Sequence, residues 1–575
     1  MLSNDEGGSR QKNLLIVCLC FVVFVVSVIF GNVRYETNDD TVFNLIAAGA
    51  YGEPSQYLLY LNIIYGYFLK MMYFLVPVVN WYLWMFLIAD FCGVVALCLI
   101  FSSKLKTIPA LALTAGINFI LYDDFYLNVQ FTKIAAFNGI VGLSLLLWAV
   151  YHKNHERMFR LAAAFFLGFG LCIRPLAVAM IFPFFLMPFT HEFIKSKRHA
   201  SFLVHNFAMI TTVAVVLLSA NYATYYLSPE WKNYMEWNSI MVERSDHGNY
   251  NFEWNREEYL ENGFTETDFK LLDFWFWGDT EYFTLDKLKL MKEIGSSTRV
   301  DTLKFSPEVL NDTVKRVTAS INIKPYLLIF TALLMLGVIT LKPNIILLFL
   351  LQFLVAFGEY YYLICTRRIE WRVECGILLT LIISTTLWSF RHENAREKAV
   401  NTIKGIGGKG IVSAILLVVT AACVLMIGCR LADQFVNIKN GYVLGQTDGN
   451  YEQIKEISES EELYVLSVDS AFGGMCGAKN IYSITKDNYY DYFHNITPIG
   501  GFIIPSPIAL YHANVAGIAN PFRALFERDD VYYVGGAERM GYVLVFLQEK
   551  YGTDITVEYV DTIGDQDVWK YKRVQ

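Results

Sequence analysis

Two adjacent carboxylates, Asp39 and Asp40, stand in the polar stretch that follows the first long apolar run of the chain. A carboxylate within hydrogen-bond reach of a hydroxyl can take its proton as the hydroxyl attacks, so such a pair can supply a general base. Adjacent like charges also raise the pKa of one partner. Asp is equally a favoured N-cap, and a helical pattern begins at Thr41, so one of the pair can simply satisfy free backbone N–H groups. Both interpretations are open from the residues alone.

An arginine-rich segment, "CTRRIEWRVECG" (Cys365 to Gly376), is a second candidate for chemistry. A guanidinium presents a planar fork of donors that can hold a phosphate in two places, which a lysine cannot copy. The alternative is surface anchoring at lipid headgroups, or pairing with Glu370 and Glu374. We favour phosphate binding. The candidate ligands are Arg372 and Arg368, followed by Arg174 and Arg367.

Composition places the chain among integral membrane proteins. Its 575 residues are 55% hydrophobic and 16% aromatic, with a mean hydropathy of +0.36. That is too apolar for a soluble protein and long enough for many spans plus an attached domain. The net charge of −7 argues against nucleic acid as a partner, since no basic stripe accompanies it. The ten scattered cysteines, without a CxxC pair, predict neither a metal site nor a disulfide framework.

The apolar runs predict eleven crossings. The first follows Arg10 and Lys12 and has no small-residue cleavage site after it, so we expect an uncleaved anchor and a cytoplasmic N-terminus. Residues 57–79 hold a central lysine and many tyrosines, and are placed as an interfacial or re-entrant helix. The predicted crossings are residues 14–31, 81–102, 107–121, 132–151, 161–173, 175–188, 203–226, 325–341, 344–363, 373–390 and 411–428.

Loop charges support this count. Short segments on the predicted inner side carry 16 Lys or Arg, and those on the outer side carry 6, as the positive-inside rule requires. The predicted domains are a transmembrane domain, residues 1–430, with external loops 32–80 and 228–323, and a small external α/β domain, residues 431–575. In the second loop, "TETD" from Thr265 predicts a capping box, and "FTLDKLKLM" a further helix start. In the tail, residues 462–468, 529–536, 555–561 and 568–574 predict strands, and residues 537–552 a helix.

This layout resembles the GT-C glycosyltransferases, the class of the protein O-mannosyltransferases and lipid A aminoarabinose transferases. The resemblance rests on the acidic pair directly after the first span, the Pro-containing turn and second surface helix that follow, the span count, and the large external loop and tail. The segments "NDDTVFNLIAAGAYGEPS", "WRVECG" and "GIANPFRALFERDDVYYVGG" are most similar to bacterial members that use polyprenyl-phosphate sugars to decorate envelope polymers.

The resemblance implies a mainly α, polytopic membrane fold of about 11 transmembrane helices, with the C-terminal domain outside the cytoplasmic membrane. It also implies an inverting transfer of a sugar from a polyprenyl-phosphate carrier to a glycan or glycolipid acceptor. Asp39 would be the general base, with Asp40 and Asn38 in orienting or capping roles. Fixed cations would stabilise the charge that grows on the lipid phosphate as it leaves. The implied partners are this donor, the acceptor and membrane lipid.

Four further acids have open roles. Asp123 and Asp124 end the third span on the outer side, where some relatives hold a metal, or they form a solvated turn. No dedicated ligand cluster stands out, so no cofactor is predicted, and a divalent metal remains open. Asp90 and Glu359 lie inside spans and either line a groove for the lipid carrier or pair within the bundle.

The loop of residues 228–323 is rich in tryptophan, and "DFWFWGD" (Asp273 to Asp279) is its densest aromatic segment. Aromatic faces can stack on sugars, although such residues more often pack a loop onto its own core.

Two other function classes were weighed. A lipid-linked glycan transporter or flippase would show two similar halves and interrupted helices, and the sequence shows no such symmetry. A structural scaffold would leave the acidic pair and the charges within spans without a role.

Overall fold

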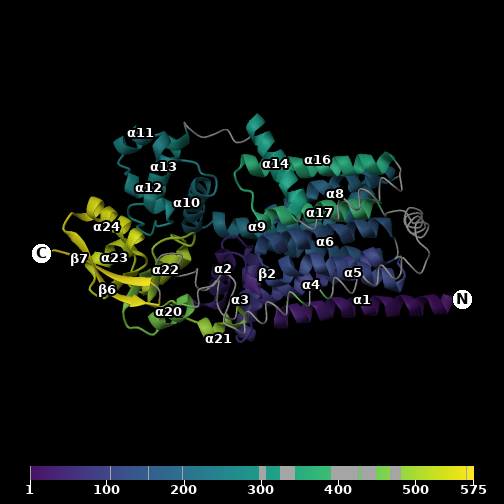
Figure 1. Cartoon of the computed structure of the whole chain (residues 1–575), viewed down its shortest axis with the longest axis horizontal. Helices are drawn as coiled ribbons and strands as arrows, with labels where there is room; N and C mark the ends of the chain where they lie inside the picture. The colour runs from purple at the N-terminus through teal and green to yellow at the C-terminus, as the bar shows by residue number, and fades with distance from the viewer. Residues whose placement is uncertain are drawn as a thin grey trace.

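The computed structural model describes residues 2–103, 105–152, 155–196, 198–296, 306–323, 343–389, 425, 429, 449–466, 481–564 and 566–574. Figure 1 shows a bundle of long helices on the side of the N-terminus and, at the opposite end, a sheet flanked by short helices near the C-terminus. The described part of the chain is mainly helical, as the sequence predicted.

The bundle is built from nine of the described helices. They are α1 (Leu2–Phe30), α4 (Trp81–Ser102), α5 (Thr107–Tyr122), α6 (Phe131–Tyr151), α7 (Glu156–Ile173), α8 (Pro175–Lys195), α9 (His199–Tyr226), α16 (Pro343–Cys365) and α17 (Trp371–Ser389). Each coincides with a predicted crossing. Among the described residues, seven helices are long and apolar enough to cross a membrane. Helix α5 has only 16 residues, and α7 has three charged residues among its first five, so these two are not among the seven.

The chain is therefore a multi-pass membrane protein, while the full count of eleven crossings stays a prediction. The predicted crossing at residues 325–341 lies outside the described residues, and so does that at residues 411–428 apart from Leu425.

Helix α6 is the centre of the bundle, because nearly all of its side chains are buried. Small residues let its neighbours approach closely, as is common in membrane bundles. A Cβ added at Gly142 would lie 3.0 Å from the carbonyl oxygen of Ala163 on α7, and one at Gly170 would lie 2.8 Å from that of Ala135. Helix α6 therefore packs closely against its neighbours in the bundle.

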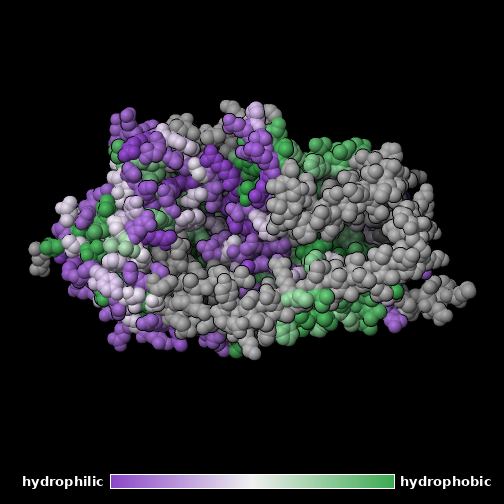
Figure 2. Space-filling view, viewed as in Figure 1, coloured by the Kyte–Doolittle hydropathy of each residue, from purple (hydrophilic) through white to green (hydrophobic). Residues whose placement is uncertain are grey.

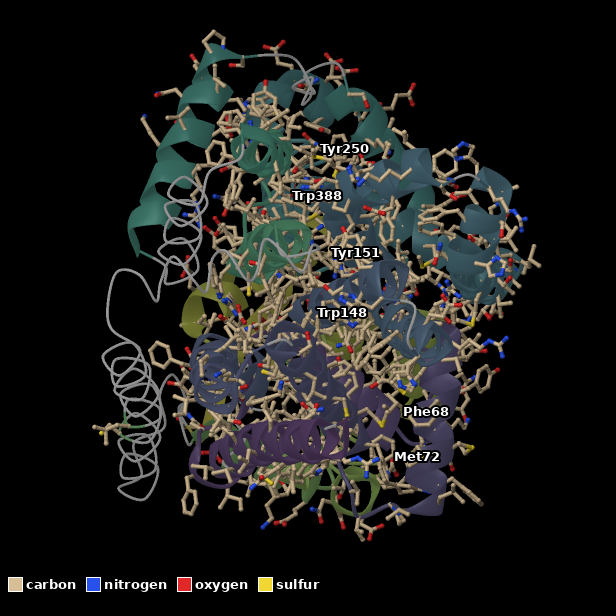
Figure 3. All side chains as sticks on the ribbon, turned by 90° about the vertical axis from the view of Figure 1, so that its right-hand side faces the viewer. Phe68, Met72, Trp148, Tyr151, Tyr250 and Trp388 are labelled. Atoms are coloured by element: carbon tan, nitrogen blue, oxygen red, sulfur yellow. The ribbon has the colours of Figure 1, made fainter. Side chains whose placement is uncertain are left out.

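Helices α2 (Asn38–Ala48) and α3 (Ile63–Leu75) lie between the first two apolar helices. The 13 residues of α3 reach about 20 Å, which is too short for the hydrocarbon core. Figure 3 looks along the bundle and shows the helix that carries Phe68 and Met72 running across the view. Its outer face exposes apolar side chains, among them Phe74, which is 78% exposed. This arrangement fits the interfacial helix predicted from the sequence.

The segment after α9 folds into short helices. They are α10 (Pro229–Ser245), η2 (Phe252–Trp254), α11 (Arg256–Glu261), α12 (Glu266–Asp273), α13 (Leu285–Ser296) and α14 (Pro307–Ile323). The predicted capping box is confirmed: the Thr265 side chain accepts from the Asp268 amide, and Asp268 accepts from the Thr265 amide. The predicted start at "FTLDKLKLM" is α13.

The C-terminal region holds a five-stranded sheet of order β4-β3-β5-β7-β6. Strand β3 is parallel to β4 and β5, whereas β7 is antiparallel to β5 and β6. The strands are β3 (Leu463–Leu466), β4 (Ile496–Pro498), β5 (Val531–Val534), β6 (Ile555–Ile563) and β7 (Gln566–Arg573), and the helices are α20 (Gly449–Ser458), α21 (Lys486–Tyr489), α22 (Pro507–Val515), α23 (Pro521–Glu527) and α24 (Ala537–Tyr551). The four predicted strands and α24 are confirmed. Strand β4 was missed, because three residues ending in proline show no alternation.

The tail and the segment after α9 are interlocked by hydrogen bonds between their backbones. The Gly278 amide donates to the Ile499 carbonyl, and the Gly501 amide donates to the Trp275 carbonyl, both at 2.8 Å. Figure 2 shows hydrophilic residues gathered over this end of the molecule and hydrophobic ones over the coloured part of the bundle. The predicted domain boundary at residues 430–431 lies outside the described residues and stays a prediction.

The orientation of the bundle is testable by thiol labelling. Lys106 lies exposed in the turn between α4 and α5, and Thr553 lies exposed between α24 and β6. In a variant whose native cysteines are replaced, Lys106→Cys should be shielded from an impermeant thiol reagent in intact cells, whereas Thr553→Cys should react. Permeabilised cells provide the control, since both positions should then react. The opposite pattern in intact cells would refute the predicted topology.

Candidate functional site

Helix α2 presents the acidic pair in its first turn. Thr37 precedes the helix in an extended conformation, with φ −131° and ψ 153°. Asp39 and Asp40 then lie next to the free amides, where the helix dipole favours negative charge. The helix ends at Gly49, whose left-handed φ of 91° lets its amide bond back to the Ile46 and Leu45 carbonyls. Local sequence therefore accounts for a short helix that starts at the two acids.

Asp40 is fully buried and accepts three hydrogen bonds. The donors are the Tyr82 hydroxyl at 2.9 Å, the Phe131 amide at 3.1 Å and the Thr37 hydroxyl at 3.1 Å. Burial raises the pKa of Asp40 to about 8, and it outweighs these donors, which act in the opposite direction. Because the donors come from α4, from the first residue of α6 and from the turn before α2, Asp40 holds these elements together.

Asp39 has a different environment. Its side chain is half-buried. Burial raises its pKa, while the positive charges of Arg372, Arg174 and Arg368 oppose that rise. The Asp246 carboxylate raises it further. Asp39 is thus the acid of the pair that faces a cationic cluster, and the preceding Asn38 is exposed at the start of the helix.

The arginines of this cluster come from two places in the fold. Arg174 joins α7 to α8, and its guanidinium lies 4.9 Å from the centre of the Phe131 ring. Arg368 and Arg372 come from the turn between α16 and α17 and from the first turn of α17. Burial lowers the pKa of Arg174, and the charges of Arg368 and Arg372 lower it too. The structure therefore gathers three of the four predicted arginines around Asp39.

The fourth, Arg367, is exposed and has a left-handed φ of 56°. It lies against the segment that follows α10, since a Cβ added at Gly248 would be 3.2 Å from its Nη1 atom. Arg368 pairs with Asp246 of the same segment at 2.6 Å. The alternative interpretation was surface anchoring or pairing with Glu370 and Glu374. Of these two acids, Glu374 is buried and bound to Arg316 through both carboxylate oxygens, at 3.0 and 2.6 Å.

Three contributors were not singled out from the sequence. They are Tyr60, Tyr82 and Asp246. Burial raises the pKa of Tyr60, and the negative charges of Asp39 and Asp246 raise it further, so Tyr60 belongs to the same cluster. Tyr60 donates to the Asn238 side chain at 3.3 Å. Nothing local distinguishes Asp246 from the other acids of its loop, because its partner lies more than a hundred residues away.

The other candidate acids have structural partners. Asp124 pairs with Lys133 at 3.3 Å and accepts from the Trp371 indole at 2.8 Å. The solvated turn is thus wrong for this residue. Asp90 accepts from the Asn138 amide at 3.1 Å inside the bundle, so it pairs there as one of the two interpretations expected. Glu359 is half-buried on α16. Within the described ranges, no group of three or more His, Cys, Asp or Glu residues could hold a metal ion.

Two solved structures are similar to this chain along nearly its full length. They are ArnT from Cupriavidus metallidurans bound to undecaprenyl phosphate, with a TM-score of 0.45 and 10% identity, and the same protein in the apo state, with a TM-score of 0.41 and 11% identity. Each match covers 97% of both chains. The similarity is distant and does not extend to particular residues.

No protein family model matches the chain, and no curated protein matches it either.

The burial of Asp40 predicts a pH dependence of stability. The folded state keeps the Asp40 proton up to a pKa of about 8, whereas the unfolded chain loses it near its ordinary value of 3.8. Stability should therefore fall as the pH rises between these values. Asp40→Asn keeps the shape and stays neutral, so its melting temperature in detergent should exceed that of the wild type at pH 8.5 and approach it near pH 4.5. Parallel curves for the two proteins would contradict this account.

Proposed function

We propose that the chain is a glycosyltransferase that moves a sugar from a polyprenyl-phosphate carrier to an envelope polymer or glycolipid, outside the cytoplasmic membrane and with inversion at the anomeric carbon. The observation that carries the proposal is the half-buried carboxylate of Asp39 facing Arg174, Arg368 and Arg372. An acid with a raised pKa beside a cluster of guanidinium groups suits a reaction that needs a base next to a phosphate.

The charge balance of this cluster supports an anionic ligand. Among the described residues named in this cluster, three guanidinium groups face two carboxylates, those of Asp39 and Asp246, which leaves an excess of one positive charge. Burial lowers the pKa of Arg174, and the like charges of Arg368 and Arg372 lower it further, so additional negative charge would stabilise these cations. A phosphate would supply that charge and accept bidentate hydrogen bonds from guanidinium groups.

In the proposed reaction Asp39 takes the proton of an acceptor hydroxyl as its oxygen attacks the anomeric carbon. The bond from that carbon to the lipid phosphate breaks, and the phosphate oxygen leaves with the electron pair. Arg174, Arg368 and Arg372 stabilise the charge that grows there, because they are already in place and partly shielded from water. Asp40 is a positioning residue, since it holds α2 against α4 and α6 without facing the cluster.

Replacing Asp39 tests the base. Asp39→Asn keeps the size and the ability to lie in a first helical turn, but removes the lone pair that accepts the proton. Transfer should fall by at least a hundredfold, within the range that general bases contribute. Membrane insertion and melting temperature should stay close to the wild type. The measurement is the sugar content of envelope glycans from cells that carry each variant.

Asp487→Asn is the matched control, because Asp487 is an exposed acid in the first turn of another helix, α21. It should leave transfer unchanged. Normal glycans in the Asp39 variant would refute the base assignment, and a glycan of normal composition that accumulates on the wrong side of the membrane would favour a transporter instead.

Replacing Arg372 tests the phosphate site. Arg372→Lys keeps the charge but loses the planar fork, so the affinity of the purified protein for undecaprenyl phosphate should drop about tenfold or more. Arg256→Lys is the control, since Arg256 is an exposed, ion-paired arginine of α11 outside this cluster. If the wild type and the Arg372 variant bind undecaprenyl phosphate with equal affinity, the cluster only anchors the protein at the membrane surface.

A further inference from the structure

A cavity of about 210 Å³ lies between the segment that follows α10 and the end of α12. It is separate from Asp39 but adjoins the arginine cluster through one short segment. Asp246 of that segment pairs with Arg368, and His247 contacts the Thr366 carbonyl at 2.7 Å through its Nδ1 atom. Gly248 lines the cavity and lies against Arg367. Cavity and arginine cluster therefore share a wall.

The cavity wall contains buried polar groups without protein partners. Arg244, which is 8% exposed, donates from Nη2 to Asp273 at 2.6 Å and to the Phe269 carbonyl at 3.2 Å. Its Nε atom has no partner among the described residues, and neither has the Ser245 hydroxyl. An unsatisfied buried donor costs about 1–3 kcal/mol. The cavity is thus lined by polar residues, Arg244, Ser245, Asn249, Asn251 and Asp273, and a small rotation of the Ser245 hydroxyl or the Arg244 side chain would let its unpartnered group meet a polar ligand.

Trp275 supplies an aromatic wall of the same cavity. Its backbone is left-handed, with φ 64°, which is rare for so large a residue. The C-terminal region holds it there: the Gly501 amide donates to the Trp275 carbonyl, and a Cβ added at Gly500 would lie 1.7 Å from that oxygen. The ring lies 5.2 Å from Trp277, which is buried and hydrogen-bonded to the Gly501 and Ile504 carbonyls. The aromatic wall is thus rigidly supported.

From this geometry we infer that the cavity binds a neutral pyranose ring of the acceptor glycan. That the sugar belongs to the acceptor rests on the proposed function, whereas the binding of a sugar rests on the cavity itself. An aromatic face suits the apolar C–H face of a pyranose, and tryptophan presents the largest such face. The polar groups on the other walls include both donors and acceptors, which suits hydroxyls, since each hydroxyl donates and accepts.

Electrostatics favours a neutral ring over an anion. The charge of Arg244 is matched by Asp273, whose carboxylate is itself largely exposed. A phosphate in this cavity would lie beside that carboxylate, whereas a sugar hydroxyl can donate to it. The arginine cluster on the other side of the shared wall has the opposite balance. The two neighbouring sites thus differ in the ligands that they favour, as a donor phosphate and an acceptor sugar require.

The test measures the binding of methyl hexopyranosides to the full-length protein in detergent by saturation-transfer NMR. Trp275→Ala removes the ring but keeps the backbone contact with Gly501, so affinity for the glycoside that binds best should fall at least tenfold. Trp275→Phe should restore part of it. Trp254→Ala is the matched control, because Trp254 is an exposed tryptophan of η2 in the same region and is not part of the cavity wall. It should bind as the wild type does.

The outcomes separate this inference from the proposed function. Asp39→Asn should still bind the glycoside, because its effect is on transfer and not on this cavity. If glycoside binding depends on Trp275 but the protein transfers no sugar, the sugar site is supported and the proposed glycosyltransferase activity is refuted. No binding by the wild type, equal binding by Trp275→Ala, or binding of inorganic phosphate in place of the glycoside would overturn the inference.

Discussion

The hydrogen bonds that converge on the buried carboxyl group of Asp40 are the interaction on which the arrangement of the site depends. A buried carboxyl group is costly unless donors surround it, and here three donors from different parts of the chain converge on one side chain. One of them is the first amide of α6, the most deeply buried helix of the bundle. The Tyr82 and Phe131 donors thus tie the start of α2 to α4 and α6, while the Thr37 donor comes from the turn before the helix. The bundle core thus helps to set the position of a short, largely buried helix through this residue.

The different environments of the two acids follow from this contact. Successive residues of a helix point about 100° apart, so when Asp40 points toward α4 and α6, Asp39 must point elsewhere. That other direction faces the junction of α7 and α8 and the turn before α17, which carry the arginines. Charge is balanced in parts: Asp246 pairs with Arg368, and Asp39 offsets the mutual repulsion of the cations around it. An excess of positive charge is left in the arginine cluster, where the proposed reaction needs to bind a phosphate.

The segments outside the bundle are hydrogen-bonded to one another and together position the arginine cluster. Asp246 follows a long helix and precedes several short ones, which alone would hold it poorly. The C-terminal region steadies these helices: Asn520 donates to Asp279 at 2.8 Å, and Gly500 allows the close approach of the Trp275 carbonyl. A side chain at Gly500 could not fit there, so the absence of a Cβ at this position is part of what brings the tail and the loop together. The turn between α16 and α17, which carries Arg368, is thus held both by the bundle and by the segments outside it.

The sequence by itself determined the features that depend on near neighbours. Apolar runs marked the nine helices of the bundle that the structure describes, because burial in lipid depends on continuous hydrophobicity. The capping box at Thr265 followed from four adjacent residues. The central lysine and the tyrosines of residues 57–79 predicted an interfacial or re-entrant helix, and the 13 residues of α3 fit that prediction.

Only the tertiary structure decided the pairings between distant residues. Which of Asp39 and Asp40 is buried depends on the direction from which α4 and α6 approach, and no local pattern contains that direction. Glu374 lies two residues from Arg372 but binds Arg316, and Arg368 binds Asp246, because side-chain contacts follow the packing of helices and not their order in the chain. The cavity beside Trp275 depends on Gly500, more than two hundred residues later. Such contacts arise only when the whole fold is assembled, since their energy comes from burial that the separate segments do not have.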